Sequence, residues 1–87
     1  MIVNLYTLTG SHYRLDSDAM TWERLVKSGE SGELRTEHGE IRGSFPSVFD
    51  IGSGVAWESS PAPSTPPDKR RAIYTSDLVS VDYEYGI

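Results

Sequence analysis

Apolar and polar side chains alternate along the start of the chain in a pattern typical of two short strands. In residues 11–16, Tyr13 and Leu15 are separated by polar side chains, which places both apolar side chains on one face of a strand. Residues 2–8 carry apolar side chains on both faces, as expected of a strand that is covered on both sides. Gly10 supplies a turn between the two segments. The pattern therefore predicts a hairpin of residues 2–8 and 11–16.

Residues 17–27 fit two different periodicities. Trp22, Leu25 and Val26 are spaced as on one face of a helix, and the Asp and Ser residues before them could cap its first turn. In a strand, Met20, Trp22 and Val26 would share one face instead. Because so short a helix nucleates poorly on its own, we favour the strand, with the helix as the alternative.

The middle of the chain contains shorter and less regular segments. Residues 34–36 are predicted to form a short strand, residues 37–40 a turn whose glycine has a positive φ, and Ile41 the start of the returning strand. An irregular stretch begins at Phe45, and residues 55–58 then have the composition of another strand.

The apolar pattern slips between two strands in the last part of the chain. Ile73 is followed by the polar residues 75–77, after which Leu78, and then Val79 and Val81, resume an apolar pattern. A polar insertion of this length changes which face points inward, since side chains alternate with period two. Thr, Ser and Asp favour tight turns, so we predict one 3₁₀ turn at residues 75–77 that delivers Leu78 to the core. Small SH3-like barrels close in this way.

Together these segments predict an all-β fold, a five- to six-stranded, SH3-like, partly open β-barrel that occupies residues 1–87 as a single domain. A chain of 87 residues buries only about 60–65% of the surface that its unfolded form exposes, so the core is thin, and we expect Trp22 and Trp57 in it. The absence of cysteine excludes disulfides and thiolate metal sites. Residues 59–69 hold every proline except Pro46; we predict a protruding loop there, and a proline-rich ligand for an aromatic groove is the alternative.

The charge of the chain limits the classes of partner. Thirteen acidic and 8 basic residues give a net charge of −5, which argues against a nucleic-acid partner because duplex binding needs a basic excess. No apolar run approaches the roughly 18 residues of a membrane span, and the start of the chain lacks the basic region of a secretion signal, so we expect a cytoplasmic protein without a membrane partner. The basic cluster Lys69, Arg70 and Arg71 is interpreted as solvated charge at the start of a strand, with a local anion contact as the alternative.

The sequence contains no recognisable catalytic or metal-binding motif. No G-x-S-x-G elbow surrounds the serines, and the Gly-Ser-Gly of residues 52–54 is interpreted as a turn between strands. His12 and His38 are expected on the surface. Glu37, His38 and Glu40 could be imagined as metal ligands, but neighbouring side chains on a turn rarely converge on one ion. We therefore expect no enzyme activity, no catalytic residue, no metal and no cofactor.

The final strand carries the strongest candidates for an interface. Val81, Tyr83 and Tyr85 share one face of this strand, and Asp82 and Glu84 lie on the other. Tyrosine is common at interfaces because its ring is apolar while its hydroxyl stays wet. An apolar edge strand is also a template for pairing with another chain, so we predict a homodimer or small ring that uses Val81, Tyr83 and Tyr85.

The order of several short motifs resembles a group of viral proteins. The motifs are Y-x-L-D, T-W-x-R, L-R-T-x-x-G, V-x-x-I-G-x-G and R-x-I-x-T-S-x-L-V-S-V, at residues 13–16, 21–24, 34–39, 48–54 and 71–81. This order is similar to that of small accessory proteins encoded by bacteriophages of actinobacteria, most of them without an assigned function.

The resemblance implies expression in the cytoplasm of a bacterial host and a non-enzymatic protein that binds a host protein. Two alternatives are an oligomeric binder of a small molecule, such as a nucleotide signal in host defence, and a minor component of the virion. In the small-molecule alternative, Lys69, Arg70 and Arg71 would line the binding site. The resemblance identifies no catalytic or binding residue in this chain.

Overall fold

The computed structural model describes residues 1–27, 32–59 and 71–85. These residues form seven strands: β1 (Ile2–Thr7), β2 (His12–Asp16), β3 (Thr21–Lys27), β4 (Glu33–Arg42), β5 (Ala56–Ser59), β6 (Arg71–Tyr74) and β7 (Leu78–Glu84). The all-β prediction is confirmed. The favoured strand within residues 17–27 is also confirmed, as β3, whereas the predicted count of five or six strands is not, because the described residues form seven.

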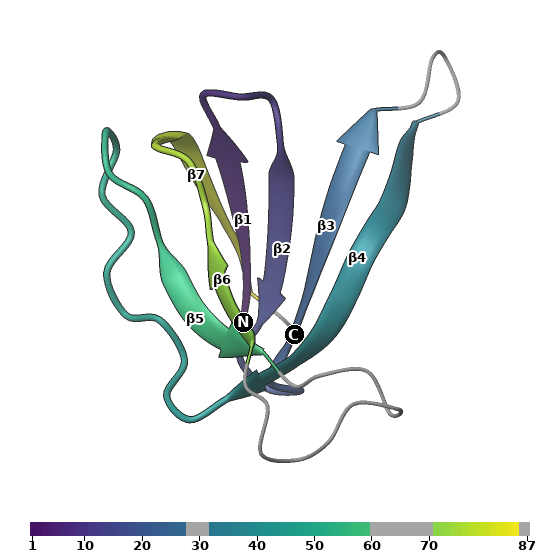
Figure 1. Cartoon of the computed structure of the whole chain (residues 1–87), viewed down its shortest axis with the longest axis vertical. Helices are drawn as coiled ribbons and strands as arrows, with labels where there is room; N and C mark the ends of the chain where they lie inside the picture. The colour runs from purple at the N-terminus through teal and green to yellow at the C-terminus, as the bar shows by residue number, and fades with distance from the viewer. Residues whose placement is uncertain (28–31, 60–70, 86–87) are drawn as a thin grey trace.

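The strands form one antiparallel sheet that curls into an open half-barrel (Figure 1). Their order across the sheet is β6-β5-β4-β3-β2-β1-β7, so β6 and β7 lie at its two edges. Strand β4 pairs with β3 through most of its length and with β5 only at Ile41 and Arg42. It therefore joins β5 and β6 to the other four strands. The half-barrel has an inner face, which carries the core, and an outer face.

The first hairpin follows the predicted alternation. Strands β1 and β2 pair in a register that sets Val3 opposite Leu15 and Leu5 opposite Tyr13, so all four side chains lie on the inner face and are buried. Asp16 stabilises the turn before β3, because its carboxylate accepts hydrogen bonds from the backbone N–H groups of Asp18 and Ala19. Side chain to backbone bonds of this kind stabilise turns. A turn therefore connects β2 to β3, and the alternative helix does not form.

The predicted strand at residues 34–36 is confirmed, but the predicted turn at 37–40 is wrong. These residues belong to one continuous strand, β4, and Gly39 lies inside it without a positive φ. A Cβ at Gly39 would lie 2.7 Å from Ser59 Oγ and 2.9 Å from Trp22 Nε1. The glycine is therefore needed for the close approach of two side chains and not for a turn.

The prediction of a 3₁₀ turn at residues 75–77 is also wrong, although the segment does connect the last two strands. It contains no 3₁₀ turn, and the Thr75 N–H donates to the carbonyl oxygen of Val55 at 2.9 Å while the Leu8 N–H donates to that of Asp77 at 2.9 Å. The Leu78 N–H donates to the carbonyl oxygen of Ser53 at 3.0 Å. Neighbouring segments thus satisfy the backbone groups that a tight turn would have satisfied internally. Leu78 still reaches the core, as predicted, with no exposed surface.

The core fills the inner face of the half-barrel. Trp22 and Trp57 are both buried, as predicted, and their rings meet edge to face with centroids 5.7 Å apart. Tyr13 meets Trp57 in the same way at 5.6 Å. The buried apolar residues are Val3, Leu5, Tyr13, Leu15, Trp22, Ile41, Val55, Trp57, Ile73 and Leu78.

Within the three described segments there is no helix with the length and apolar character needed to cross a bilayer. The predicted proline-rich loop lies outside the described residues, except for Ser59 at the end of β5.

Candidate functional site

Strand β7 forms one edge of the sheet and is bonded on one side only. It pairs antiparallel with β1, with Leu5 opposite Val81 and Val3 opposite Tyr83. On its other side, its backbone contacts with described residues involve only its first residue: the Gly52 N–H donates to the Leu78 carbonyl oxygen at 2.8 Å, and Ile51 forms a parallel bridge with Leu78. From Val79 to Glu84, no described residue pairs with this edge, and we call it the open edge of β7.

Four aromatic rings form a ladder beside this open edge. Phe45, Phe49, Tyr83 and Tyr85 follow one another with centroid separations of 6.5, 6.4 and 6.4 Å. The first two contacts are edge to face, and the two tyrosine rings lie nearly parallel at 18°. Aromatic pairs at such separations attract one another, so the ladder is held in place by its own contacts as well as by β7.

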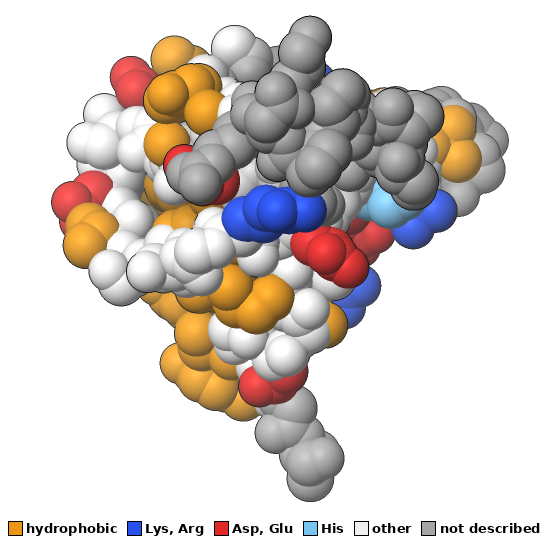
Figure 2. All heavy atoms as spheres, turned by 60° about the horizontal axis from the view of Figure 1, so that its bottom comes forward, with side chains coloured by type: hydrophobic (Ala, Val, Ile, Leu, Met, Phe, Trp, Pro, Cys, Tyr) orange, Lys and Arg blue, Asp and Glu red, His pale blue; other side chains and the backbone are white. Residues whose placement is uncertain are grey.

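The aromatic ladder is open to solvent at its tyrosine end. Tyr83 is 45% exposed and Tyr85 is 74% exposed, and Val48, Ile51 and Val79 nearby in the chain are at least half exposed. Figure 2 shows that the hydrophobic side chains on the face it draws gather in patches instead of being scattered singly. Exposed apolar surface that gathers in this way is typical of a binding surface.

The predicted interface residues are therefore partly brought together. Val81 is half-buried against the core, whereas Tyr83 and Tyr85 project into the ladder. The sequence prediction missed Phe45 and Phe49, which lie in an irregular segment without strand alternation. The presence of two phenylalanines in such a segment could have indicated a packing site, because apolar rings outside strands also tend to pack against other apolar groups.

The predicted anion contact cannot be placed on this surface. Lys69 and Arg70 lie outside the described residues. Arg71 is the first residue of β6, on the opposite edge of the sheet from β7, and its side chain lies outside the description.

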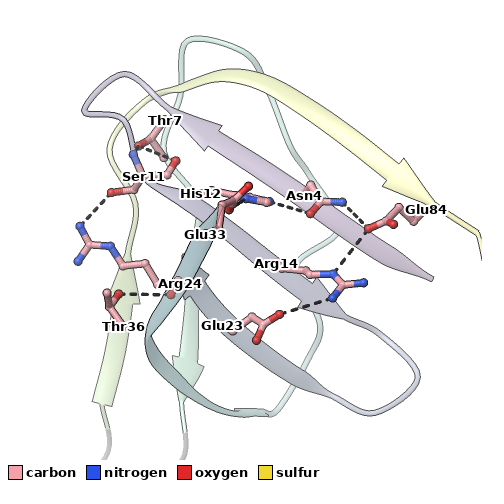
Figure 3. A network of polar contacts seen from close by, with 10 residues as sticks. All are labelled: Asn4, Thr7, Ser11, His12, Arg14, Glu23, Arg24, Glu33, Thr36 and Glu84. Atoms are coloured by element: carbon pink, nitrogen blue, oxygen red, sulfur yellow. Dashed lines mark hydrogen bonds and ion pairs between the residues drawn. The ribbon is translucent and has the colours of Figure 1, made fainter. Parts of the chain in front are cut away.

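The outer face next to β7 carries a continuous polar network (Figure 3). Asn4 lies at its centre: its amide nitrogen donates to Glu84 Oε2 at 2.7 Å, and its amide oxygen lies 2.7 Å from His12 Nε2. Arg14 links Glu84 to Glu23, with nitrogen–oxygen distances of 3.6 Å to each carboxylate. The network joins β7, β1, β2 and β3 on this face.

His12 is not the surface residue that the sequence predicted. Its side chain is only 13% exposed, and its ring stacks on that of Tyr6 with centroids 4.4 Å apart. Its Nδ1 contacts the carboxylate of Glu33, so both ring nitrogens face oxygen atoms. The doubly protonated ring can donate to both partners, whereas a neutral ring can donate to only one of them. His38, by contrast, is exposed as predicted.

Three acidic residues set the electrostatics around Tyr6. Burial raises the pKa of the Tyr6 hydroxyl, and the negative charges of Glu33, Asp82 and Glu84 raise it further. A negative potential of this kind disfavours the phenolate. The part of the outer face that adjoins β7 is therefore electronegative.

A small cavity opens on the inner face at the other side of the half-barrel. Its volume is about 240 Å³, below the roughly 300–1,000 Å³ of typical ligand pockets. The guanidinium of Arg24 lies in it over the ring of Tyr13, donating to Ser11 Oγ at 2.9 Å and to Glu37 Oε1 at 3.4 Å. Its buried Nε has no partner among the described residues. The cavity is lined by Tyr13, Trp22, Arg24, Glu37, Ala72, Ile73 and Tyr74.

No metal-binding cluster accompanies these surfaces in the part of the chain that the structure describes. Groups of three or more His, Asp or Glu side chains that could hold a metal ion do not occur there, and Glu37, His38 and Glu40 form none. Residues 52–54 form a turn as predicted, with Gly52 at a φ of +91° and the Ser53 N–H bonded to the carbonyl oxygen of Asp50.

Comparison with known proteins adds no relative. No protein-family model, no curated protein and no solved structure matches this chain.

Proposed function

We propose that this chain is a non-enzymatic interaction module that binds another protein through the aromatic ladder beside β7. The observation that carries the proposal is the run of four contacting rings that ends in two exposed tyrosines at an open strand edge. Rigid tyrosine and phenylalanine rings supply large contact areas at low entropic cost, which is why aromatic residues dominate binding energy at interfaces.

The resemblance to accessory proteins of actinobacterial phages supports a host protein as the partner and the host cytoplasm as the place of action. The connection of β6 to β7 across the two edges of a small curled sheet supports the finer proposal of an SH3-like barrel. A minor virion component is the alternative that detection of the chain in purified particles would favour.

Affinity purification from host lysate tests the proposal. The wild type should capture a host protein, and a variant carrying Tyr83→Ser and Tyr85→Ser should lose it. Tyr74→Ser is the matched control, because Tyr74 is also 75% exposed but lies on β6, at the other edge of the sheet. Equal capture by all three proteins, or no capture by the wild type, would contradict the proposal.

The cavity around Arg24 favours a second candidate function, the binding of a small anionic molecule. A buried guanidinium nitrogen without a partner among the described residues can donate to a ligand oxygen. Mass spectrometry of the supernatant after denaturation should then detect a co-purified anion that is lost in Arg24→Gln. A supernatant free of small molecules, together with no binding of added nucleotides, would contradict this second function.

The homodimer or small ring predicted from the sequence would bury the same residues of β7. Light scattering at micromolar concentration should then give a mass above the 9.7 kDa of one chain. A single-chain mass that is unchanged by deletion of residues 83–87 would contradict self-association.

A further inference from the structure

The open edge of β7 presents two chemically different faces to a strand that would pair with it. Val81 and Tyr83 lie opposite Leu5 and Val3 of β1 and so belong to the inner face, whereas Asp82 lies opposite Asn4 and belongs to the outer face. Directly opposite residues of antiparallel strands point to the same face. An added strand would therefore meet apolar side chains on one face and acidic ones on the other.

The acidic face of this edge has charge available for a partner. The side chain of Asp82 is exposed and makes no hydrogen bond or ion pair with any residue that the structure describes. Glu84 is 55% exposed, and Arg14, its cationic neighbour, is shared with Glu23. Burial raises the pKa of Tyr6 most, and the negative charges of Glu33, Asp82 and Glu84 raise it further. The whole chain carries a net charge of −5.

We propose that the open edge of β7 accepts an extended basic segment of a partner protein as an added antiparallel strand, with lysine or arginine alternating with apolar residues. The basic side chains would lie opposite Asp82 and Glu84, and the apolar ones would lie beside Val81 and Tyr83 and against the aromatic ladder. Backbone hydrogen bonds to the free edge supply affinity in this mode of recognition, and the alternating side chains supply specificity. The inference rests on the proposed function and names the chemistry of the partner.

A second copy of β7 is a weaker occupant of this edge. Two-fold pairing centred on Asp82 would set this carboxylate against its own copy, and pairing centred on Tyr83 would set Asp82 against Glu84. Like charges directly opposite each other destabilise a strand pair. Pairing centred on Val81 avoids this contact but draws in Val79, where the register of β7 shifts by one residue against β1.

Binding of a short synthetic peptide that alternates lysine and valine tests the inference. In NMR spectra of the intact chain, the peptide should shift the backbone amide signals of residues 79–84 and slow their hydrogen exchange. The counterpart that alternates glutamate and valine should cause neither effect. Binding should weaken with added salt, because exposed charge pairs are screened.

Variants separate charge recognition from general loss of charge. Asp82→Asn and Glu84→Gln should each weaken binding about two- to fivefold, the range expected for one cross-strand charge pair. Glu40→Gln is the control, because it removes the same charge from an exposed residue of β4, which lies four strands away from β7 in the sheet. It should leave the affinity for the peptide unchanged. Equal binding of both peptides, or shifts confined to residues away from β7, would overturn the inference.

The same two experiments keep the inference and the proposed function apart. If a host protein is captured through Tyr83 and Tyr85 but the lysine peptide does not bind β7, the strand-addition inference fails and the proposed function stands. If the peptide adds to β7 but no host protein is captured, the proposed function fails while the chemistry of the edge is supported. A dimer that dissociates neither with the peptide nor with salt would overturn the inference in favour of a second copy.

Discussion

The indole Nε1 of Trp22 donates a hydrogen bond of 2.8 Å to Ser59 Oγ, joining β3 to β5 inside the core. Gly39 of β4 lies directly against this pair. Trp22 is 2% exposed and Ser59 is 1% exposed, so neither side chain can move into solvent to make room.

We predict that Gly39→Ala destabilises the fold. The new methyl group would lie 2.7 Å from Ser59 Oγ and 2.9 Å from Trp22 Nε1, closer than ordinary contact. Overpacking of this kind costs about 1–3 kcal/mol, more than alanine gains over glycine in a strand. Urea unfolding measures the loss. An unchanged or increased free energy of unfolding would show that β3 and β5 can separate at no cost.

The two core tryptophans should respond differently to the same substitution. Trp22→Phe removes the hydrogen bond to Ser59, whereas the Nε1 of Trp57 is buried without a partner among the described residues. Both variants lose similar ring volume, so Trp57→Phe serves as the matched control. We expect Trp22→Phe to cost about 1 kcal/mol more, the net value of one hydrogen bond. Thermal or urea unfolding compares them, and equal losses would contradict a stabilising role for this bond.

Asn4→Asp should destabilise the junction of β1 and β7 at neutral pH. Asn4 is 6% exposed and donates to Glu84, and an aspartate there would set two carboxylates against each other. A buried polar group that loses its partner costs about 1–3 kcal/mol. Glu84→Gln in the Asn4→Asp background removes the repulsion and should recover part of the loss. Failure of this double variant to recover stability would contradict the bridging role of Asn4.

Asp16 should contribute to the acid sensitivity of the fold. The backbone N–H of Ala19 lowers the pKa of Asp16 most, and the N–H of Asp18, the N-terminal ammonium group and Arg14 lower it further against an opposing effect of burial. Because the folded pKa lies below the ordinary value of 3.8, the carboxylate contributes stability that is present above that value and is lost as the pH falls through the folded pKa.

The corresponding measurement is the free energy of unfolding at neutral and at acidic pH. Asp16→Asn keeps an oxygen acceptor for the turn but has no proton to bind, so it should lower stability at neutral pH and reduce the loss on acidification. If the wild type and Asp16→Asn differed by the same amount at both pH values, Asp16 would not be a source of the acid sensitivity.

Local patterns predicted the β1–β2 hairpin, whose two strands are close in sequence, from alternation and one turn. The change of phase after Ile73 also predicted that Leu78 reaches the core, although its partners in the sheet are distant in sequence. Gly39 was misread because its neighbours, Trp22 and Ser59, meet it only in the folded sheet. A glycine that permits close approach and one that forms a turn look alike in a sequence.

The site was predictable where it lies on a strand and hidden where it does not. Tyr83 in β7 and Tyr85, which follows its last residue, could be assigned to one face from their spacing. Phe45 and Phe49 could not be placed, because an irregular segment has no period from which to infer its neighbours. Arg24 was missed for another reason. It lies opposite Tyr13 on the inner face, where a charged residue is not expected from the sequence.

The pairing of β1 with β7 also governs when this protein can fold during its synthesis. Asn4 and Glu84, which meet across this pair, are 80 residues apart in the chain. Contacts between such distant residues form slowly, since the intervening chain must first be ordered. During synthesis, β1 has only β2 as a neighbouring strand until β7 has emerged from the ribosomal exit tunnel. Nascent chains stalled before β7 should therefore be protease-sensitive and bind chaperones, and resistance should arise abruptly once that strand is released.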